Sequence, residues 1–484
     1  MKNIASNIKR ALFAIALLAV SAGAGAQALR TGYFMDGNLY GYRLNPALQA
    51  PRGHFSLPIL GGMQMSAMGN VGIGSFLYDS PTNPNELVTF MHQSVDTKKF
   101  LNSLEDENKM RMDFDVSILS LGFRAFGGFN TIDLNMRSQT TANLPYGLFA
   151  FMKEMGNKNY SFSDLSVESR NFFDLSIGHS REVIKGLTAG ARFKILAGLG
   201  YAGLKVDRMD IKMGKNSWEI SAKANADIAL GGAFTYDTPT EPNEKAKIDG
   251  YEDVAPGNQG YGFGADFGVT YDFNHLPKLK GLKVSASVTD LGYITWNKTA
   301  QAGIDPGYTY KFDGFTQMSI HNDKGNTLDD QWETTREELK DFFTLEDKGE
   351  GSVTTGIGAK VNLGLEYEMP FYNKLSAGLL YTHCFDDALS YNQTSLIVNI
   401  SPNKVFDFAV SGTMSTFGTS FGAMANVHCT GFNIFFGADL MNGKVNNQFA
   451  PIEDFTATMS MGISIAFGHV DKKKAKKEKV AEEE

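Results

Sequence analysis

The chain has little cysteine, since its 484 residues include only Cys384 and Cys429. Small secreted proteins that cannot build a sufficient core depend on several disulfides, so two thiols exclude a disulfide framework. His383 and His428 precede these cysteines, and both residue types bind zinc. Because neighbours in a strand point to opposite faces, neither pair can offer both side chains to one ion. The pattern predicts two buried or lipid-facing thiols and no metal site, with a two-histidine site as the alternative.

Proline and positive charge are also in short supply. The sequence has 14 prolines against 51 glycines, and no proline-rich linker or clean repeat divides residues 53–468. Many strands joined by tight turns use residues in this way, which favours one closed β-structure over several soluble domains.

The 45 lysines and arginines are outnumbered by 53 aspartates and glutamates, giving a net charge of −8. A nucleic-acid partner, which would require a basic face, is not expected.

Long apolar runs are missing except near the start of the chain. Residues 11–20, ALFAIALLAV, follow a stretch with three positive charges and precede small residues. These are the parts of a secretory signal, and ten apolar residues are half of the roughly 20 that a spanning helix needs. We predict a signal peptide at residues 1–26, with cleavage after Ala26 or Ala28. Its removal moves the net charge from −8 to −11.

What the sequence has instead is strict alternation. In TATMSMGISIAF (456–467), Met459, Met461 and Ile463 fall on one face, while Ser460 and Ser464 fall on the other. A period of two indicates an extended strand. Similar stretches recur, and the face opposite the apolar one carries Ser, Thr, Asn, Asp, Lys or Arg, as a wet or plugged lumen would. The apolar face is therefore predicted to meet lipid. Arginine is expected to be disruptive at Met461 or Ile463 and mild at Ser460 or Ser464.

About fourteen to sixteen such strands after a signal peptide are typical of an outer-membrane barrel. We predict an all-β fold, a transmembrane antiparallel β-barrel of about 14 strands (14–16) with a few short helices in its loops. The expected divisions are the signal peptide (1–26), an N-terminal hatch-like segment (27–52), the barrel (53–468) and a charged disordered tail (469–484). A secreted β-sandwich or propeller is the alternative.

Three helices are expected between strands. Residues 94–107 begin at the potential cap Ser94, and residues 143–156 have Pro145 where a first turn would lie. Thr335 and Glu338 have the spacing of a capping box. The long polar connections at 237–259 and about 298–350 are expected on the outer side of the barrel.

Asp290 interrupts the alternation of VTDLGYITW (288–296), because strict continuation would place its carboxylate in lipid. A bulge near Thr289 would turn Asp290 inward and leave Leu291 and Tyr293 facing out. Tyr293 and Trp296 are then expected at an interfacial aromatic girdle. Asp290 is interpreted as a partner of an arginine or lysine in the lumen, with a contact to a ligand as the alternative.

No stretch predicts an enzyme. GTSFG (418–422) matches the G-x-S-x-G pattern of a nucleophile elbow, but that chemistry needs a strand, a turn and a helix, and here strands lie on both sides. GFGADFG (262–268) is a glycine-rich strand with no helix after it, so it is not a phosphate loop. We predict no catalytic residues and no cofactor.

Several stretches, among them NLYGYRLNPAL (38–48), GYGFGADFGVTYDF (260–273) and SVTDLGYITWNK (287–298), resemble a Bacteroidetes-type outer-membrane barrel family of unassigned function. That family is similar to the PorV-like proteins and to the long-chain fatty-acid transporter (FadL-like) barrels. The resemblance implies that Asn45, Pro46 and Ala47 belong to a hatch inside a fourteen-stranded barrel. Tyr40 and Tyr42, which lie on a flexible glycine-containing backbone, are expected to stack against the barrel wall as part of a plug. An ordinary lead-in to the first strand is the alternative.

Two functions are compatible with these features. One is a FadL-like channel that passes small, partly hydrophobic molecules through the hatch. The other is a PorV-like, non-enzymatic shuttle or scaffold of type IX secretion or another envelope complex. The partners expected are therefore outer-membrane lipid and either a hydrophobic small molecule or envelope proteins. The location expected is the cell outer membrane.

Overall fold

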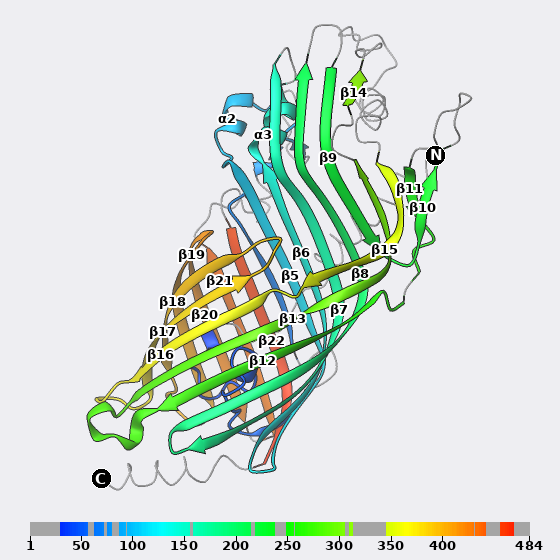
Figure 1. Ribbon diagram of the computed structural model, residues 1–484. Helices are drawn as coiled ribbons and strands as arrows, with labels where there is room; N and C mark the ends of the chain where they lie inside the picture. The colour runs from blue at the N-terminus through cyan, green and yellow to red at the C-terminus, as the bar shows by residue number, and fades with distance from the viewer. Residues whose placement is uncertain are drawn as a thin grey trace.

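A computed structural model gives a closed 14-strand antiparallel β-barrel with few helices and with 71% of the described residues in strands (Figure 1). It describes residues 30–56, 62–71, 75–79, 87–92, 94–154, 158–213, 218–237, 248–255, 257–304, 309–312, 345–429, 431–441 and 455–468. The predicted fold class and strand number are confirmed. The signal peptide, the tail at 469–484 and the helix expected at Thr335 lie outside the described residues.

The barrel wall follows chain order, each strand pairing with its neighbour. Thirteen positions in the ring are occupied by β5 (Glu107–Ala125), β6 (Gly128–Pro145), β7 (Asn159–Ile184), β8 (Leu187–Met213), β12 (Gly260–Asp272), β13 (Leu282–Ile304), β16 (Ala359–Glu368), β17 (Leu375–Phe385), β18 (Tyr391–Ile400), β19 (Phe406–Ser415), β20 (Gly418–Cys429), β21 (Phe432–Met441) and β22 (Phe455–Phe467). The fourteenth position is shared by β1 (Gly53–Ser56) and β2 (Met63–Gly69), which both pair with β22. Because β1 also pairs with β5, the ring closes there.

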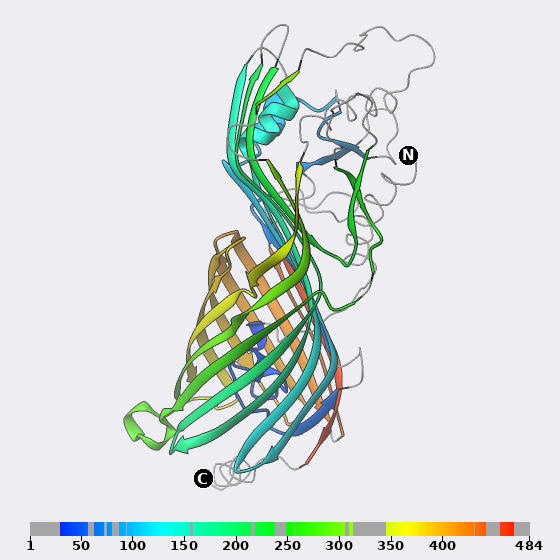
Figure 2. The same cartoon turned by 45° about the vertical axis from the view of Figure 1, so that its right-hand side comes forward.

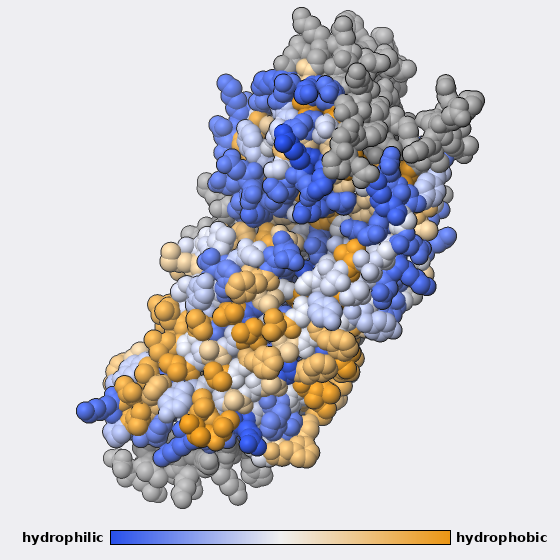
Figure 3. All heavy atoms as spheres, viewed as in Figure 1, coloured by the Kyte–Doolittle hydropathy of each residue, from blue (hydrophilic) through white to orange (hydrophobic). Residues whose placement is uncertain are grey.

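The outward side of the wall is apolar around its lower half, where Figure 3 shows a broad hydrophobic region. On β22 the side chain of Ile463 is 37% exposed, whereas Ser460 and Ser464 on the other face are buried. Exposed leucine, isoleucine, phenylalanine and tyrosine side chains repeat at alternate positions of β7, β8, β12, β16, β17 and β19. The alternation predicted for these strands is confirmed.

Above the barrel, β7 and β8 continue into a sheet extension that includes β9 (Trp218–Ala229), β14 (Thr309–Phe312) and β15 (Glu346–Gly356) (Figures 1 and 2). Helices α2 (Thr97–Leu101) and α3 (Tyr146–Glu154) cover its inner face around a core with Phe100, Phe149 and Met209. The other short elements are η1 (Arg30–Gly32), η2 (Gly41–Arg43), β3 (Leu77–Asp79), β4 (Leu87–Thr89), β10 (Ala233–Tyr236), β11 (Ile248–Glu252), η4 (Phe273–His275) and η5 (Pro277–Leu279).

Both described helices differ from their predicted starts. Asp96, not Ser94, caps α2, because its side chain accepts a hydrogen bond from the backbone N–H of Lys99. Pro145 ends strand β6 instead of lying in the first turn of α3, since its backbone extends the ladder with Glu107. Within the described ranges, no helix has the length and apolar character to cross a membrane.

Trp296 is not at a girdle, and that prediction was wrong. Leu291 and Tyr293 are about half exposed, as expected, but Trp296 is fully buried and its ring stacks at 5.3 Å on Tyr201. The alternation explains this difference, because Leu291 and Tyr293 face outward and Trp296 lies on the opposite face of β13.

The two thiols are free as predicted, Cys384 buried and Cys429 half-buried.

Candidate functional site

Residues 30–50, here called the inner segment, lie inside the lower half of the barrel, drawn in dark blue in Figures 1 and 2. The segment folds into the short turns η1 and η2, with no described residue of it paired in a β-ladder with the wall. Glycines and an asparagine shape it locally, since Asn38 donates to the carbonyl of Gly32 and accepts from the N–H of Tyr40. The segment is therefore held in the lumen by side-chain contacts.

Asn45 is the central anchor of the inner segment and is fully buried. Its amide donates to the Tyr33 hydroxyl at 3.1 Å and to the carbonyl of Val269 on β12 at 3.3 Å. Its Oδ1 atom accepts from the N–H of Ala47 at 2.9 Å, which closes a turn around Pro46. The three predicted hatch residues thus lie together against the wall, although their role as a hatch stays a prediction.

Two wall glycines make room for this turn. A Cβ atom at Gly268 would lie 2.0 Å from Asn45 Oδ1, and one at Gly190 would lie 2.3 Å from the carbonyl oxygen of Pro46. The Phe34 ring packs in the same way against a glycine of β17, since a Cβ at Gly378 would lie 2.4 Å from the ring. The glycines of these strands let the backbone of the wall approach the inner segment closely.

Tyr40 and Tyr42 pack against the wall, as the sequence predicted for their rings. The Tyr40 ring lies 5.6 Å from Phe435, and its hydroxyl is 2.5 Å from Ser464 Oγ. The Tyr42 hydroxyl donates to Asp133 Oδ1 at 2.9 Å. Burial raises the pKa of the Tyr40 hydroxyl to about 12 and also raises that of Tyr42. Both hydroxyls therefore remain protonated at neutral pH.

Asp290 lies at the bulge predicted near Thr289. Ala265 pairs with Leu291 and Phe267 pairs with Val288, so Asp266 alone opposes both Thr289 and Asp290. Asp290 has a φ of 58°, a left-handed conformation that aspartate adopts more readily than most residues. Its backbone N–H donates to Asp266 Oδ1 at 2.7 Å, which stabilises the bulge.

The inward carboxylate of Asp290 is paired, as predicted, with cations of the wall. Arg137 donates to both of its oxygens at 2.8 and 3.0 Å, and Lys194 Nζ lies 2.5 Å away. Lys360 Nζ lies 3.6 Å from the second oxygen. All four groups are largely buried, so the charges compensate one another out of contact with solvent. A direct contact between Asp290 and a ligand stays a prediction.

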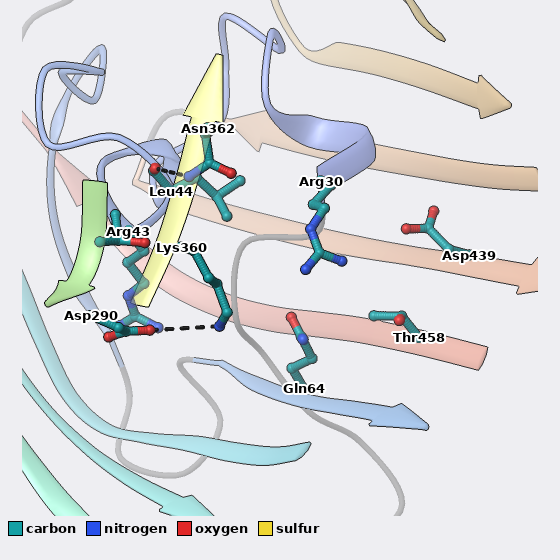
Figure 4. Close-up of a pocket in the computed structure, with 10 residues that line it drawn as sticks. Arg30, Arg43, Leu44, Gln64, Asp290, Lys360, Asn362, Asp439 and Thr458 are labelled. Atoms are coloured by element: carbon teal, nitrogen blue, oxygen red, sulfur yellow. Dashed lines mark hydrogen bonds and ion pairs between the residues drawn. The ribbon is translucent and has the colours of Figure 1, made fainter. Parts of the chain in front are cut away.

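A small polar cavity remains between the inner segment and the wall (Figure 4). Its volume is about 30 Å³, room for roughly two waters. In Figure 4, Asp290 and Lys360 face each other at one side, and Asn362 donates to the carbonyl of Leu44. A cavity of this size does not hold an organic molecule.

Arg43 is the residue of this site that the sequence analysis missed. Its guanidinium lies 2.9 Å from Asp133 on β6 and over the Tyr40 ring at 4.7 Å. Asp133 and Arg137 were identifiable as lumen residues from the alternation of NTIDLNMR (130–137). Their partners were not, because pairing across a barrel depends on strand tilt and register.

Solved structures similar to this chain include three barrels. They are the toluene transporter TbuX of Ralstonia pickettii (10% identity, 92% of this chain and 96% of that chain, TM-score 0.39), the toluene transporter TodX of Pseudomonas putida (8%, 92% and 95%, 0.38) and the translocator domain of the autotransporter NalP of Neisseria meningitidis (10%, 86% and 88%, 0.31). At these scores the likeness carries no argument about function. The PorV-like resemblance stays a prediction.

No curated protein matches the chain. The model of the family described as "Family of unknown function (DUF5723)" matches residues 46–439, most of the chain. This range includes Asn45's neighbours Pro46 and Ala47 and ends at Asp439 on β21. The chain therefore belongs to the DUF5723 family.

Proposed function

We propose that this protein is an outer-membrane barrel that passes small, partly hydrophobic molecules when its inner segment moves aside. One observation carries the proposal: the inner segment fills the lumen without joining the wall by any described β-ladder. Neutral side-chain hydrogen bonds are individually modest, typically about 0.5–1.5 kcal/mol each, and the buried ion pair of Arg43 with Asp133 is the stronger contact that a solute has to replace. A plug held in this way can leave while the barrel stays closed.

The environment of the inner segment supports a solute of mixed character. Met35, Leu39 and Tyr40 pack against Phe435 and Met424 of the wall. Nearby, hydroxyl and amide groups of the wall bond the segment, as Ser287 does through Leu44. A molecule that replaces the segment meets both kinds of surface. The apolar outward face of the strands supports the outer-membrane location, with lipid as the partner outside.

The second candidate, a non-enzymatic PorV-like shuttle or scaffold, is favoured by the sheet extension. The outward face of β8 and β9 there carries exposed ion pairs, including Lys223 with Asp207 and Arg208 with Asp210. Such a polar sheet standing above the barrel offers room for an envelope partner. Under this alternative the inner segment is a permanent seal.

Deleting residues 30–50 while keeping what precedes them separates the two candidates. The channel proposal expects a barrel whose gel mobility still changes on heating and whose single-channel conductance in planar bilayers rises well above that of the intact protein. The matched control is the intact chain with Gly412→Ala, since a Cβ at Gly412 has no heavy atom within 4 Å. A folded deletion variant whose conductance remains that of the control would refute the hatch and leave the scaffold.

A further inference from the structure

A chain of alternating charges runs from the inner segment through the wall. Each contact in it is 2.5–3.1 Å long. In order, its members are Arg43, Asp133, Arg192, Asp266, Lys194, Asp290, Arg137 and Asp115. Only the first belongs to the inner segment; the other seven belong to the wall, where Lys360, 3.6 Å from Asp290, adds one further cation. Without the inner segment, this series of charged groups has a carboxylate at each end, Asp133 at one and Asp115 at the other.

Asp133 is the carboxylate that would lose its cation. It is fully buried and accepts hydrogen bonds from Arg43 at 2.9 Å, Tyr42 at 2.9 Å and Ser120 at 2.7 Å, besides its contact with Arg192. Two of these four partners, Arg43 and Tyr42, depart with the inner segment. A buried carboxylate with part of its partners removed attracts a positively charged replacement.

A second carboxylate under the segment has the same sign. Asp439 on β21 accepts from the Thr31 hydroxyl at 2.5 Å and lies in the cavity wall with Arg30, a cation of the inner segment. The Arg43 guanidinium contacts Asp133, while Arg30 and Asp439 line the same cavity. A molecule that replaces the inner segment meets a wall carboxylate at both positions.

Aromatic and unsatisfied polar groups also lie on the wall around the inner segment. Phe129 is 6.4 Å from the Tyr42 ring, and Phe435 is 5.6 Å from the Tyr40 ring, so both wall rings become available when the segment moves. Asn433 lies on the same face of β21 as Phe435 and is 1% exposed. Neither of its amide atoms has a hydrogen-bond partner among the described residues. A buried amide without partners is unusual and points to a polar ligand at this wall.

We infer that the position of the Arg43 guanidinium on Asp133 is the binding position for the cationic group of a solute. The class of ligand is a small organic amine or guanidine with an aromatic or apolar body, since the wall offers Asp133 for the charge and Phe129 for the body. This inference rests on the proposed function, because it takes the inner segment to be displaceable. It specifies the chemical class of solute that would bind in the lumen of the proposed channel.

The test uses three probes of similar size on the full-length protein in detergent. Benzylguanidinium carries one positive charge, benzylurea is its neutral isostere, and benzenesulfonate is an anion. Arg43→Gln removes the resident cation, shortens the side chain by two atoms and keeps a polar amide at its end. Equilibrium dialysis of this variant is expected to give benzylguanidinium an affinity at least about tenfold higher than benzylurea, with benzenesulfonate weakest. The double variant Arg43→Gln, Asp133→Asn is expected to lose the difference.

Equal affinity for the charged and neutral probes, or a preference that survives in the double variant, would overturn the inference. If Arg43→Gln gives no heat-modifiable barrel, the intact protein in proteoliposomes supplies the measurement. Benzylguanidinium is then expected to enter at least about fivefold faster than benzenesulfonate, and equal or reversed rates overturn the inference.

The two proposals fail in different ways. Entry of all three probes at equal rates would refute the cationic binding position and leave the channel standing. Binding of benzylguanidinium by Arg43→Gln without entry of any probe into proteoliposomes would refute the channel and leave the binding position standing.

Discussion

At Gly268 the wall comes so close to the inner segment that one methyl group has no room. A Cβ there would meet Asn45 Oδ1 at 2.0 Å and Pro46 Cδ at 2.9 Å. Since overpacking typically costs about 1–3 kcal/mol, we expect Gly268→Ala to displace the Asn45 turn before it unfolds the barrel. Single-channel recording should show more frequent or larger openings. Gly412→Ala on β19 is the matched control. Identical recordings for the two variants would contradict the idea that Gly268 makes room for the Asn45 turn.

Asp290 is expected to matter for stability because its carboxylate is buried among cations. Breaking a buried pair leaves uncompensated charge and typically costs about 3–5 kcal/mol, so Asp290→Asn should lower the urea midpoint of unfolding clearly. Asp207 offers a control, because its partners Lys205 and Lys223 are at least half exposed on the sheet extension. Asp207→Asn should cost no more than about 1 kcal/mol. Equal losses in the two variants would mean that Asp290 is not buried among cations.

At the scale of the elements, periodicity predicted the wall well. The strand expected at residues 456–467 is β22, Phe455–Phe467, and the bulge expected near Thr289 lies at Thr289 and Asp290. Both features depend on residues that are close to one another in the sequence, so the sequence alone could predict them. The partners of Asp290 come from β6, β8 and β16, so they depend on strand order and register around the whole ring. For the same reason Arg43 was missed, since nothing near it in the chain indicates Asp133.

The sheet extension has a core of its own, which permits a test of its independence. Phe100 on α2 is fully buried, stacks on Phe90 at 4.6 Å and lies 5.9 Å from Phe149. Phe100→Ala typically costs about 3–5 kcal/mol in such a core. We expect faster proteolysis near α2 and an unchanged heat-modifiable shift of the barrel.

Phe126, which is 84% exposed at the turn between β5 and β6, provides the control. Phe126→Ala should alter neither proteolysis nor the shift. Loss of the barrel shift in Phe100→Ala would show that the extension and the barrel fold as one cooperative unit.

For the whole molecule, the apolar outward face predicts where charge is tolerated. Ile463→Arg should cost about 2–4 kcal/mol near the middle of the bilayer, because a guanidinium would meet lipid. Ser163→Arg, at an exposed position of β7 in the extension, should be neutral. Folding yields into lipid vesicles measure both. A tolerated Ile463→Arg would contradict a lipid-facing β22.

The expectation that arginine would be mild on the opposite face of β22 was wrong for Ser464. That side chain is fully buried and its Oγ is 2.5 Å from the Tyr40 hydroxyl. The inner segment occupies the lumen at this level. An arginine at position 464 would collide with the inner segment. The outward and inward faces of β22 therefore contact different surroundings, but neither face tolerates a large charged side chain freely.

The fourteenth position of the ring joins the two ends of the described barrel. β1 follows the inner segment directly, yet its main partner β22 is the last described strand of the chain. The ladder between β1 and β5 has only two registered pairs, so the early part of the chain cannot close a cylinder by itself. A ring without β22 would leave the inner segment open at the side. Enclosure of the segment therefore requires the complete barrel, as does the contact of Tyr40 with Ser464 on β22.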